Sequence, residues 1–274
     1  MSGTLYLVAT PIGNMKDISS RAISILSSVD AILSEDTRNS IHLLRQYNIN
    51  TELISFHEYS SEKKLKNVLN ALKEGQDLAL VSDAGTPLIS DPGYFLVKQV
   101  LDNNFKVISV PGPSALISAL VASGLSTNKF IFEGFPPRKK LELRSLLKTF
   151  EFETRTIIFY ESPKRIINLV ESILKTLGDQ RRICVAREIS KIHEMYITKP
   201  PSELLKEFDT NPFLKKGEAV VILEGATNSS KALDENLEFL FSELKEHISL
   251  NNFSKIFSKV SNLSKKEIYN KFIE

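Results

Sequence analysis

The 274-residue sequence contains a single cysteine, Cys184, which has no partner for an internal disulfide. Because disulfides persist in oxidising compartments, a lone cysteine is typical of a protein in a reducing cytoplasm. The histidines are also few and scattered, and no Cys/His cluster has the spacing of zinc ligands. We therefore expect a cytoplasmic protein without a metal site.

Long apolar runs are missing as well. No uninterrupted apolar stretch approaches the ~20 residues that span a bilayer, so no membrane segment is expected. The first four residues carry no basic side chain and lead directly into Leu5-Tyr6-Leu7-Val8. This pattern predicts a first strand and not a signal peptide.

The net charge is only +2, but it is unevenly distributed. Between Gly134 and Arg187, twelve Lys or Arg residues stand against six Asp or Glu, and from Leu250 onward five Lys stand against two Glu. Two basic segments on a nearly neutral protein indicate an anionic partner. The alternative is that both are ordinary solvated faces.

The first 125 residues alternate between short apolar runs and stretches with helical spacing. This alternation predicts a parallel sheet covered by helices on both faces. The runs expected to form strands are Leu5–Ala9, Ala31–Leu33, Leu53–Phe56, Leu78–Val81 and Val107–Val110.

A second α/β unit is expected after the irregular segment around residues 123–129. Its strands are predicted at Phe130–Phe132, Thr156–Tyr160, Ile183–Ala186, Glu194–Thr198 and Ala219–Leu223. Ser162-Pro163 predicts the start of a helix that ends at Gly178. The predicted organisation is an α/β domain over residues 1–125, a second α/β domain over 126–226, and a helical segment over 232–274. In the helical segment, Ser264 and Glu267 are predicted to form a capping box.

Three of the first-domain strands run into loops rich in proline and glycine. These loops are Thr10–Asn14, Ser82–Gly93 and Pro111–Ala115. Ligands of open α/β sheets bind beyond the carboxyl ends of the strands, so three such loops are expected to frame one site. Each loop alone is equally well explained as a turn, since proline and glycine are common in turns.

The composition of these loops narrows the ligand. A phosphate site needs free backbone N–H groups and often a lysine, but proline has no N–H and the loops have only Lys16 at one edge. They offer hydroxyls and the carboxylates of Asp83 and Asp91 instead. Such a surface suits an uncharged or cationic ligand with many donors. S-adenosylmethionine fits, and a sugar or a free amino acid fits nearly as well.

Nine stretches of the sequence resemble the tetrapyrrole methylase family of methyltransferases. They cover residues 5–224 in the family's order and spacing, and they are "LYLVATPIGNMKDIS", "SEDTRNS", "SFHE", "SDAGTPLISDPGY", "VPGPSAL", "FEGFPPRKK", "FYESPKR", "AREISKIHE" and "GEAVVILEG". Within that family the chain is similar to bacterial enzymes that methylate a cytidine ribose in the decoding centre of 16S rRNA. The tail "LSKKEIYN" resembles the helix-turn-helix segment of that subfamily.

The resemblance implies two α/β domains with the cofactor in the cleft between them, and a homodimer. It implies S-adenosylmethionine as the methyl donor and the 2'-hydroxyl of a cytidine in the assembled small subunit as the acceptor. The expected cofactor-binding residues come from the three loops and from the second domain. They are Pro11, Gly13, Asp83, Ala84, Gly85, Thr86, Pro87, Ser114, Ala115, Tyr160, Gly217 and Glu218.

The candidate catalytic residues are Asp36, Arg38 and Glu161. Asp36 and Arg38 follow the second strand and are expected to face the ribose and its phosphate; the alternative is a local cap and ion pair around Thr37. Glu161 is a candidate base, or a carboxylate that merely precedes a helix. Asp83 is expected at the amino group or sulfonium of the cofactor, or in an Asx-turn.

Seven basic residues are expected to contact rRNA phosphates, with solubility as the alternative role of the last two: Arg138, Lys139, Lys140, Lys164, Arg165, Lys265 and Lys266. Two other functions remain open. A tetrapyrrole C-methyltransferase would share the cofactor loops without needing the basic segments. A non-catalytic RNA-binding protein would explain the basic segments but not three convergent loops.

Overall fold

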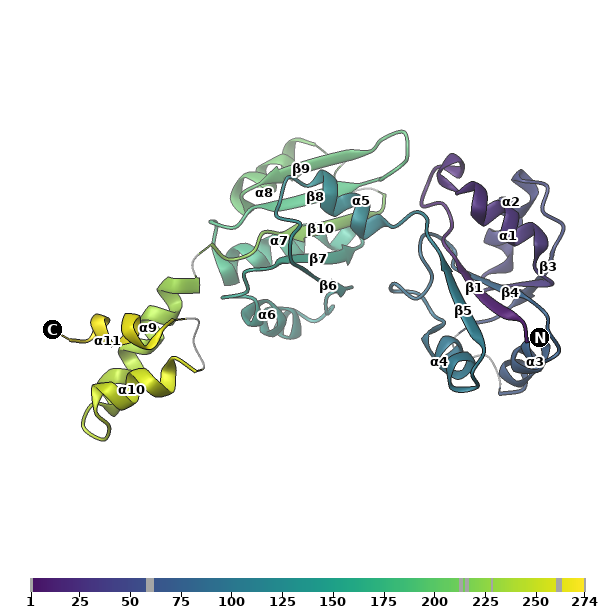
Figure 1. Ribbon diagram of the computed structural model, residues 1–274. Helices are drawn as coiled ribbons and strands as arrows, with labels where there is room; N and C mark the ends of the chain where they lie inside the picture. The colour runs from purple at the N-terminus through teal and green to yellow at the C-terminus, as the bar shows by residue number, and fades with distance from the viewer. Residues whose placement is uncertain are drawn as a thin grey trace.

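The computed structural model describes residues 2–57, 62–211, 214, 217–227, 229–259 and 263–273, without the side chains of 229–236. Figure 1 shows two α/β lobes followed by a group of C-terminal helices, and the chain termini lie at opposite ends of the molecule. The predicted α/β class with two sheets is confirmed.

The first lobe contains a five-stranded sheet in the order β3-β2-β4-β1-β5, in which every pairing is parallel. Its strands are β1 (Thr4–Val8), β2 (Ala31–Ser34), β3 (Glu52–Ser55), β4 (Leu78–Val81) and β5 (Lys106–Val110). Its helical elements are η1 (Met15–Asp17), α1 (Ser20–Ser28), α2 (Thr37–Gln46), α3 (Glu62–Lys73) and α4 (Tyr94–Asp102). The order places the carboxyl ends of β4, β1 and β5 side by side.

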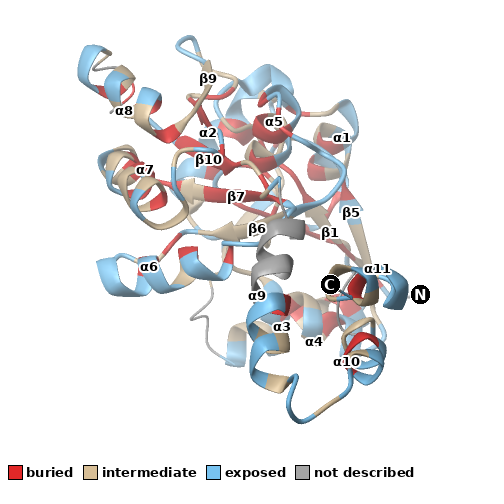
Figure 2. Cartoon of the chain, turned by 90° about the vertical axis from the view of Figure 1, so that its left-hand side faces the viewer, coloured by how far each residue is buried: buried red, intermediate tan, exposed pale blue. Residues whose placement is uncertain are grey.

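Helices cover both faces of this sheet, as the alternating pattern predicts. Leu26 of α1 and Leu43 of α2 pack in one cluster with alternate strand residues such as Val81. Leu72 of α3 and Leu96 of α4 pack in another. Figure 2 shows buried residues along the strands and on the helix sides that face them. Burial of both faces fixes the sheet and therefore the positions of the loops at its edge.

The second lobe contains a mixed sheet in the order β6-β7-β10-β8-β9. Only β6 and β7 pair in parallel; β10 is antiparallel to β7 and β8, and β9 is antiparallel to β8. Its strands are β6 (Phe130–Gly134), β7 (Thr156–Glu161), β8 (Ile183–Arg187), β9 (Met195–Lys199) and β10 (Ala219–Leu223). The helices are α5 (Ala115–Ala122), α6 (Lys140–Thr149), α7 (Pro163–Leu177) and α8 (Pro201–Thr210).

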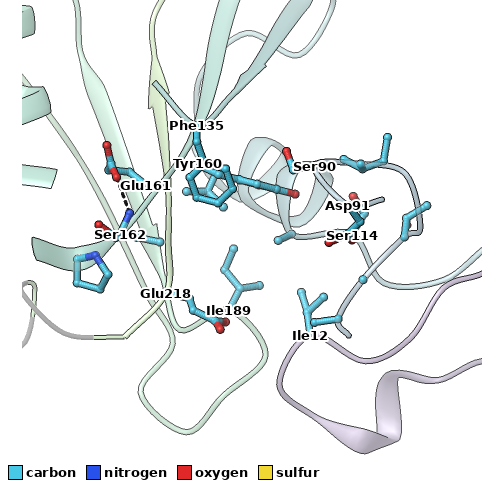
Figure 3. Close-up of a pocket in the computed structure, with 18 residues that line it drawn as sticks. Ile12, Ser90, Asp91, Ser114, Phe135, Tyr160, Glu161, Ser162, Ile189 and Glu218 are labelled. Carbon is cyan, nitrogen blue, oxygen red and sulfur yellow. Dashed lines mark hydrogen bonds between the residues drawn. The ribbon is translucent and has the colours of Figure 1, made fainter. Parts of the chain in front are cut away.

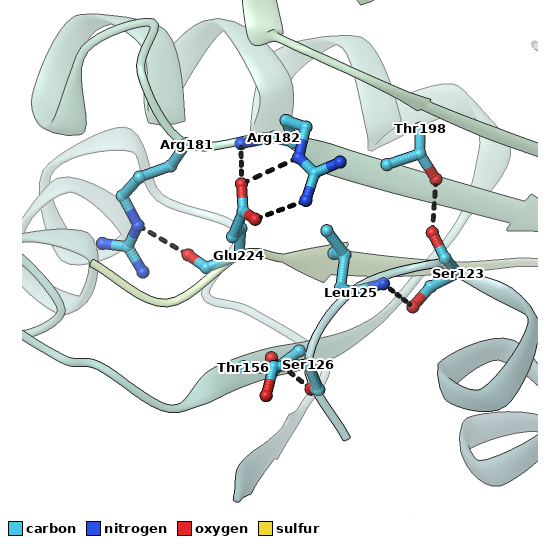
Figure 4. Close-up of polar contacts among 8 residues, drawn as sticks. All are labelled: Ser123, Leu125, Ser126, Thr156, Arg181, Arg182, Thr198 and Glu224. Carbon is cyan, nitrogen blue, oxygen red and sulfur yellow. Dashed lines mark hydrogen bonds and ion pairs between the residues drawn. The ribbon is translucent and has the colours of Figure 1, made fainter. Parts of the chain in front are cut away.

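Helix α5 packs on the second sheet, although the sequence places the domain division after it, between residues 125 and 126. Leu116 and Leu120 of α5 lie in one cluster with Ile158 and Ile222 of β7 and β10. The connection after α5 is tied to the same sheet, because Thr198 and Thr156 donate side-chain hydrogen bonds of 2.7 Å to the carbonyls of Ser123 and Ser126 (Figure 4). By its packing, α5 therefore belongs to the second lobe.

A buried arginine closes the far end of the second sheet. Arg181 donates from Nε to the carbonyl of Glu224 at 2.6 Å (Figure 4). It also donates from Nη1 to the carbonyl of Phe150 at 2.6 Å. Burial lowers the pKa of Arg181 to about 10. Arg182 next to it pairs with the Glu224 carboxylate at 2.6 Å. These bonds hold the ends of β8 and β10 together.

The C-terminal segment consists of α9 (Ser229–Leu244), α10 (Leu250–Phe257) and α11 (Lys265–Lys271). Leu237, Phe253 and Ile268 form its own core cluster. The predicted capping box is present, since the N–H of Glu267 donates to Ser264 Oγ and the N–H of Ser264 donates to the Glu267 carboxylate. Among the helices that the structure describes, none is long and apolar enough to cross a membrane.

Candidate functional site

The three proline- and glycine-rich loops meet, as the sequence predicts. Thr10 and Gly85 exchange backbone hydrogen bonds of 2.8 and 3.0 Å, which join the loops after β1 and β4. Thr86 donates from Oγ1 to the carbonyl of Pro113 at 3.0 Å, which joins the loops after β4 and β5. The loops therefore form one hydrogen-bonded wall at the carboxyl edge of the sheet.

This wall forms one side of a cavity between the two lobes, and the second sheet forms the other side. The cavity has a volume of about 410 Å³, within the range of small-molecule sites. Figure 3 shows Tyr160 and Glu218 of the second lobe facing Ile12, Ser90 and Asp91 of the first. The remaining lining residues are Ala84, Gly85, Thr86, Ile89, Ser114, Ala115, Phe135, Glu161, Ser162, Pro163, Ile189, Ala219 and Val220.

The chemistry of the lining agrees with the ligand class deduced from the loops. Among the described residues that line the cavity, none is a lysine or an arginine, and three are carboxylates: Asp91, Glu161 and Glu218. Tyr160 supplies a flat apolar surface, held by edge contacts of its ring with Phe132 and Phe135. A planar, uncharged or cationic ligand fits this lining, and a phosphate does not.

Unusual backbone conformations gather at the cavity. Six described residues other than glycine have positive φ angles, and two of them are asparagines, which tolerate this conformation. The other four are Leu88 and Ser90 on the first wall and Glu188 and Ser190 on the loop opposite, with φ between 50° and 72°. Such conformations cost roughly 1–3 kcal/mol each and are typical of functional sites.

The structure brings seven of the twelve predicted cofactor residues to the cavity: Ala84, Gly85, Thr86, Ser114, Ala115, Tyr160 and Glu218. Pro11, Gly13, Asp83, Pro87 and Gly217 are not in its lining. Asp83 binds helix α2 instead. Its carboxylate accepts hydrogen bonds from the N–H of Asp36 at 3.3 Å and from Asn39 Nδ2 at 3.0 Å.

Gly13 and Gly217 support the cavity from behind. A Cβ on Gly13 would lie 2.5 Å from Lys191 Cγ, and one on Gly217 would lie 2.2 Å from Oε1 of Glu188. The same Glu188 oxygen accepts hydrogen bonds from the N–H of Glu218 at 3.0 Å and from Lys191 Nζ at 3.2 Å. These two glycines therefore leave room for a loop that holds Ile189 and Glu218 in place.

Asp36 and Arg38 adopt the arrangement that the sequence analysis gave as the alternative. Asp36 Oδ1 accepts from the N–H of Arg38 at 2.9 Å, which caps α2, and Oδ2 pairs with Arg38 Nη2 at 2.6 Å. The side-chain and backbone hydrogen bonds from Arg38 lower the pKa of Asp36 to about 2. Neither residue lines the cavity.

Glu161 does line the cavity, but its carboxylate is occupied. It accepts from the N–H of Ser162 and from Nη2 of Arg165, each at 2.7 Å. The same Arg165 nitrogen donates to the carbonyl of Pro136 at 2.8 Å. Arg165, which is predicted to contact RNA, makes these intramolecular bonds through Nη2.

Asp91 is the residue that the sequence analysis did not select. It lines the cavity, and burial raises its pKa to about 6, with a smaller contribution from the nearby charges of Glu35 and Asp83. The only signal in the sequence is its place in the loop Ser82–Gly93. Nothing in that pattern indicates which of the two aspartates, Asp83 or Asp91, faces the ligand.

The remaining basic candidates are exposed. Arg138 is exposed in a loop before α6, and Lys139 pairs with Glu142 at 2.9 Å while its side chain is 80% exposed. Lys140 and Lys164 are exposed near the start of α6 and α7, and Lys265 and Lys266 are exposed at the start of α11. These residues lie where an anionic partner can reach them.

The known proteins to which this chain is similar are methyltransferases. The sequence model described as tetrapyrrole (corrin/porphyrin) methylases matches residues 4–205. A curated relative from Escherichia coli O157:H7 is named ribosomal RNA small subunit methyltransferase I; it is 39% identical over 272 residues, which cover 99% of this chain and 95% of the relative. A relative of the same name from Thermotoga maritima is 47% identical over 81% of this chain and 99% of its own.

Solved structures share the fold at lower identity. The cobalt precorrin-4 methyltransferase CbiF covers 81% of this chain and 94% of its own at 17% identity, with a TM-score of 0.58. The methyltransferase CobJ covers 82% and 95% at 15% identity, with a TM-score of 0.60. At this level of identity the likeness concerns the fold alone.

Proposed function

This chain belongs to the tetrapyrrole methylase family, and from that premise we propose that it methylates small-subunit ribosomal RNA with S-adenosylmethionine as the donor. The observation that carries the proposal is the cavity between the lobes, whose described lining contains carboxylates, hydroxyls and apolar surface but no lysine or arginine. The curated relatives that carry the rRNA methyltransferase name match nearly the whole chain.

The lining fits the proposed donor by its chemistry. Adenosine needs an apolar, partly aromatic wall, which Tyr160, Phe135 and Ile189 offer. The amino group and the sulfonium are cationic, and the carboxylate of Glu218 is available to balance them. Ser114 and Thr86 add hydroxyl groups. Nothing in the described lining provides the positive charge that a nucleotide phosphate needs.

The donor supplies a methyl group bound to a positively charged sulfur. An oxygen nucleophile bonds to the methyl carbon in line with the carbon–sulfur bond, and the sulfur is the leaving group. The residues of this chain then have to orient the two reactants and exclude water, and orientation alone is worth about 7–11 kcal/mol in favourable cases. The hydrogen-bonded loops and the tied loop at Glu188 make the walls rigid enough for this task. Within the proposal, the acceptor is the 2'-hydroxyl of a cytidine in 16S rRNA.

Exposed basic residues support an RNA acceptor over a tetrapyrrole. Arg138, Lys139 and Lys140 precede or begin α6, and Lys265 and Lys266 begin α11. Phosphate contacts from such residues would position the RNA without reading its sequence. We also propose a homodimer, which the molar mass from light scattering tests, and a cytoplasmic location, which follows from the rRNA substrate.

The decisive assay offers labelled S-adenosylmethionine with small ribosomal subunits from a strain that lacks this methylation. Labelled rRNA that yields 2'-O-methylcytidine on digestion is the expected result. A parallel reaction offers a uroporphyrinogen-type substrate, because the family also contains tetrapyrrole methylases. Label in the tetrapyrrole and none in the rRNA would overturn the proposal. Cofactor binding without transfer to either would leave a non-catalytic RNA-binding role as the better account.

A further inference from the structure

A second, larger cavity opens beside the first. Its volume is about 830 Å³, and it lies along the amino-terminal half of α4 and the end of β3. The two cavities share Ser90 and Asp91, which are the only residues that line both among those described. The second cavity therefore adjoins the proposed methyl-donor site at these two residues.

Aromatic side chains are unusually exposed at the second cavity. Tyr94 and Phe95, the first residues of α4, line it and are 73% and 60% exposed. Phe56 lines the same cavity and is buried. Exposed aromatic rings beside a cavity are typical platforms for nucleic acid bases, each stacked base contributing about 1–3 kcal/mol. Without such a role, exposing a large apolar side chain to water costs free energy and adds nothing to the packing of the fold.

The charged groups of the second cavity favour an amine-bearing base and not a phosphate. Its described lining contains three carboxylates, those of Glu35, Glu62 and Asp91, and a single lysine or arginine, Lys66. Carboxylates accept hydrogen bonds from the exocyclic amino group of cytosine, and they repel phosphate. The occupant is therefore a neutral ring with an amino group, carried on a backbone that stays outside.

We propose that the second cavity is the acceptor subsite, in which the base of a cytidine turned out of the RNA stack lies against Tyr94 and Phe95 while its ribose lies at Ser90 and Asp91. This inference rests on the proposed rRNA methylation and deepens it. Only such a placement brings a ribose hydroxyl to the point where the two cavities meet. The amino group of the base is then within the part of the cavity that Glu35 lines.

Asp91 is the proton acceptor in this arrangement. The ribose 2'-oxygen forms a bond to the methyl carbon as the bond from that carbon to sulfur breaks. The sulfur keeps the electron pair of the broken bond, and the hydroxyl proton passes to the Asp91 carboxylate. The groups that face Asp91 are the hydroxyl of Ser82, the carboxylates of Glu35 and Asp83, and Tyr160 across the donor cavity. No other acceptor or oxidant is required.

A tryptophan reporter tests the subsite without relying on activity. The sequence contains no tryptophan, so Phe95→Trp introduces a single indole into the cavity. Leu101→Trp is the matched control, because Leu101 is 54% exposed on the same helix and lies outside the cavity lining. Titration with cytidine 5'-monophosphate is expected to quench Phe95→Trp and to leave Leu101→Trp unchanged. Uridine 5'-monophosphate, which lacks the amino group, should bind at least about fivefold more weakly.

Kinetics with unmethylated small subunits complete the test. Phe95→Ala should raise KM for the subunit about tenfold or more at unchanged cofactor affinity, whereas Leu101→Ala should not. Asp91→Asn should lower kcat by about 10²-fold or more and remove the rise of the wild-type rate with pH. Equal KM values for the two alanine variants, or equal quenching of the two tryptophan reporters, would overturn the subsite while rRNA methylation by the wild type stands. Absence of any rRNA labelling by the wild type would instead defeat the proposed function.

Discussion

Arg165, in the first turn of α7, places its Nη2 2.7 Å from Oε2 of Glu161, the last residue of β7. The Glu161 side chain is 2% exposed and that of Arg165 is 27% exposed, so the pair is largely removed from water. A carboxylate in such a place needs a partner, because an unpaired buried charge is costly. This pair therefore stabilises the wall of the cavity between the lobes. Of its two residues, the sequence analysis predicted Glu161 to be catalytic and Arg165 to contact RNA.

Arg165→Ala should lower the free energy of unfolding by about 3 kcal/mol, because it leaves the buried Glu161 carboxylate without its cation. Urea denaturation at neutral pH measures the effect. Lys164→Ala is the control, since Lys164 is exposed beside it and should change stability by less than about 0.5 kcal/mol. A second substitution, Glu161→Gln, should recover part of the loss in Arg165→Ala. Equal stabilities of the two alanine variants would show that the pair contributes nothing.

Gly217→Ala should disturb the donor cavity from behind. Gly217 has φ of 79°, and a Cβ there would lie 2.2 Å from the Glu188 carboxylate, which holds the N–H of Glu218 and Lys191 Nζ. Displacement of Glu188 should weaken S-adenosylmethionine binding about tenfold, as measured by calorimetry, which corresponds to about 1.4 kcal/mol.

Gly178→Ala separates backbone strain from this clash. Gly178 has nearly the same φ of 80°, but a Cβ there would meet nothing within 4 Å. Both variants should lose about 1 kcal/mol of stability from the positive φ. Only Gly217→Ala should lose cofactor affinity, and a similar loss in both variants would contradict the role given to Glu188.

Asp91→Asn should change how stability depends on pH. Burial raises the pKa of Asp91 to about 6 from an ordinary value of 3.8, with Glu35 and Asp83 adding to the effect. The folded state therefore binds this proton more tightly than the unfolded state, and the free energy of unfolding falls as pH rises from about 4 to about 6. Urea denaturation at about pH 5 and about pH 8 compares the free energies of unfolding of the two proteins. That of Asp91→Asn should be higher relative to the wild type at the higher pH. A constant difference between the two proteins would contradict the raised pKa.

Lys139→Glu combined with Lys140→Glu should weaken binding to small subunits most at low salt. Loss of two phosphate contacts should reduce the slope of log affinity against log salt by roughly 1–2. Lys175→Glu is the control, because its side chain is 78% exposed on α7 and it is not among the residues predicted to contact RNA. A loss of affinity that is independent of salt would argue against phosphate contacts at these two lysines.

Much of the architecture follows from patterns along the chain. The alternation of apolar runs and helical spacing predicts β1 to β5 and the parallel sheet, because a strand buried on both faces must be apolar throughout. Ser162-Pro163 and Gly178 predict the two ends of α7, and Ser264 with Glu267 predicts the start of α11. These features are local, since a cap or a turn is decided by residues a few positions apart.

The site is harder to predict from local patterns than the fold is, because its walls come from distant parts of the chain. The place of the loops at the carboxyl ends of β1, β4 and β5 predicts that they meet. Their composition predicts a ligand without phosphate, since proline has no backbone N–H. Which aspartate of the loop Ser82–Gly93 faces that ligand depends on how the loop folds. In the folded loop, Leu88 and Ser90 have positive φ angles, Asp91 lines the cavity and Asp83 binds α2.

The sequence by itself therefore determines the class of the fold and the family, because these depend on periodicity and motifs, and its loop composition predicts a ligand without phosphate. Only the tertiary structure decides which side chains are free to act. Glu161 at the end of β7 is engaged with Arg165 of α7, whose guanidinium also bonds the carbonyl of Pro136 in a separate segment of the chain. Among the carboxylates in the described linings, only Asp91 lies where the two cavities meet, because strand order and loop conformation place it there.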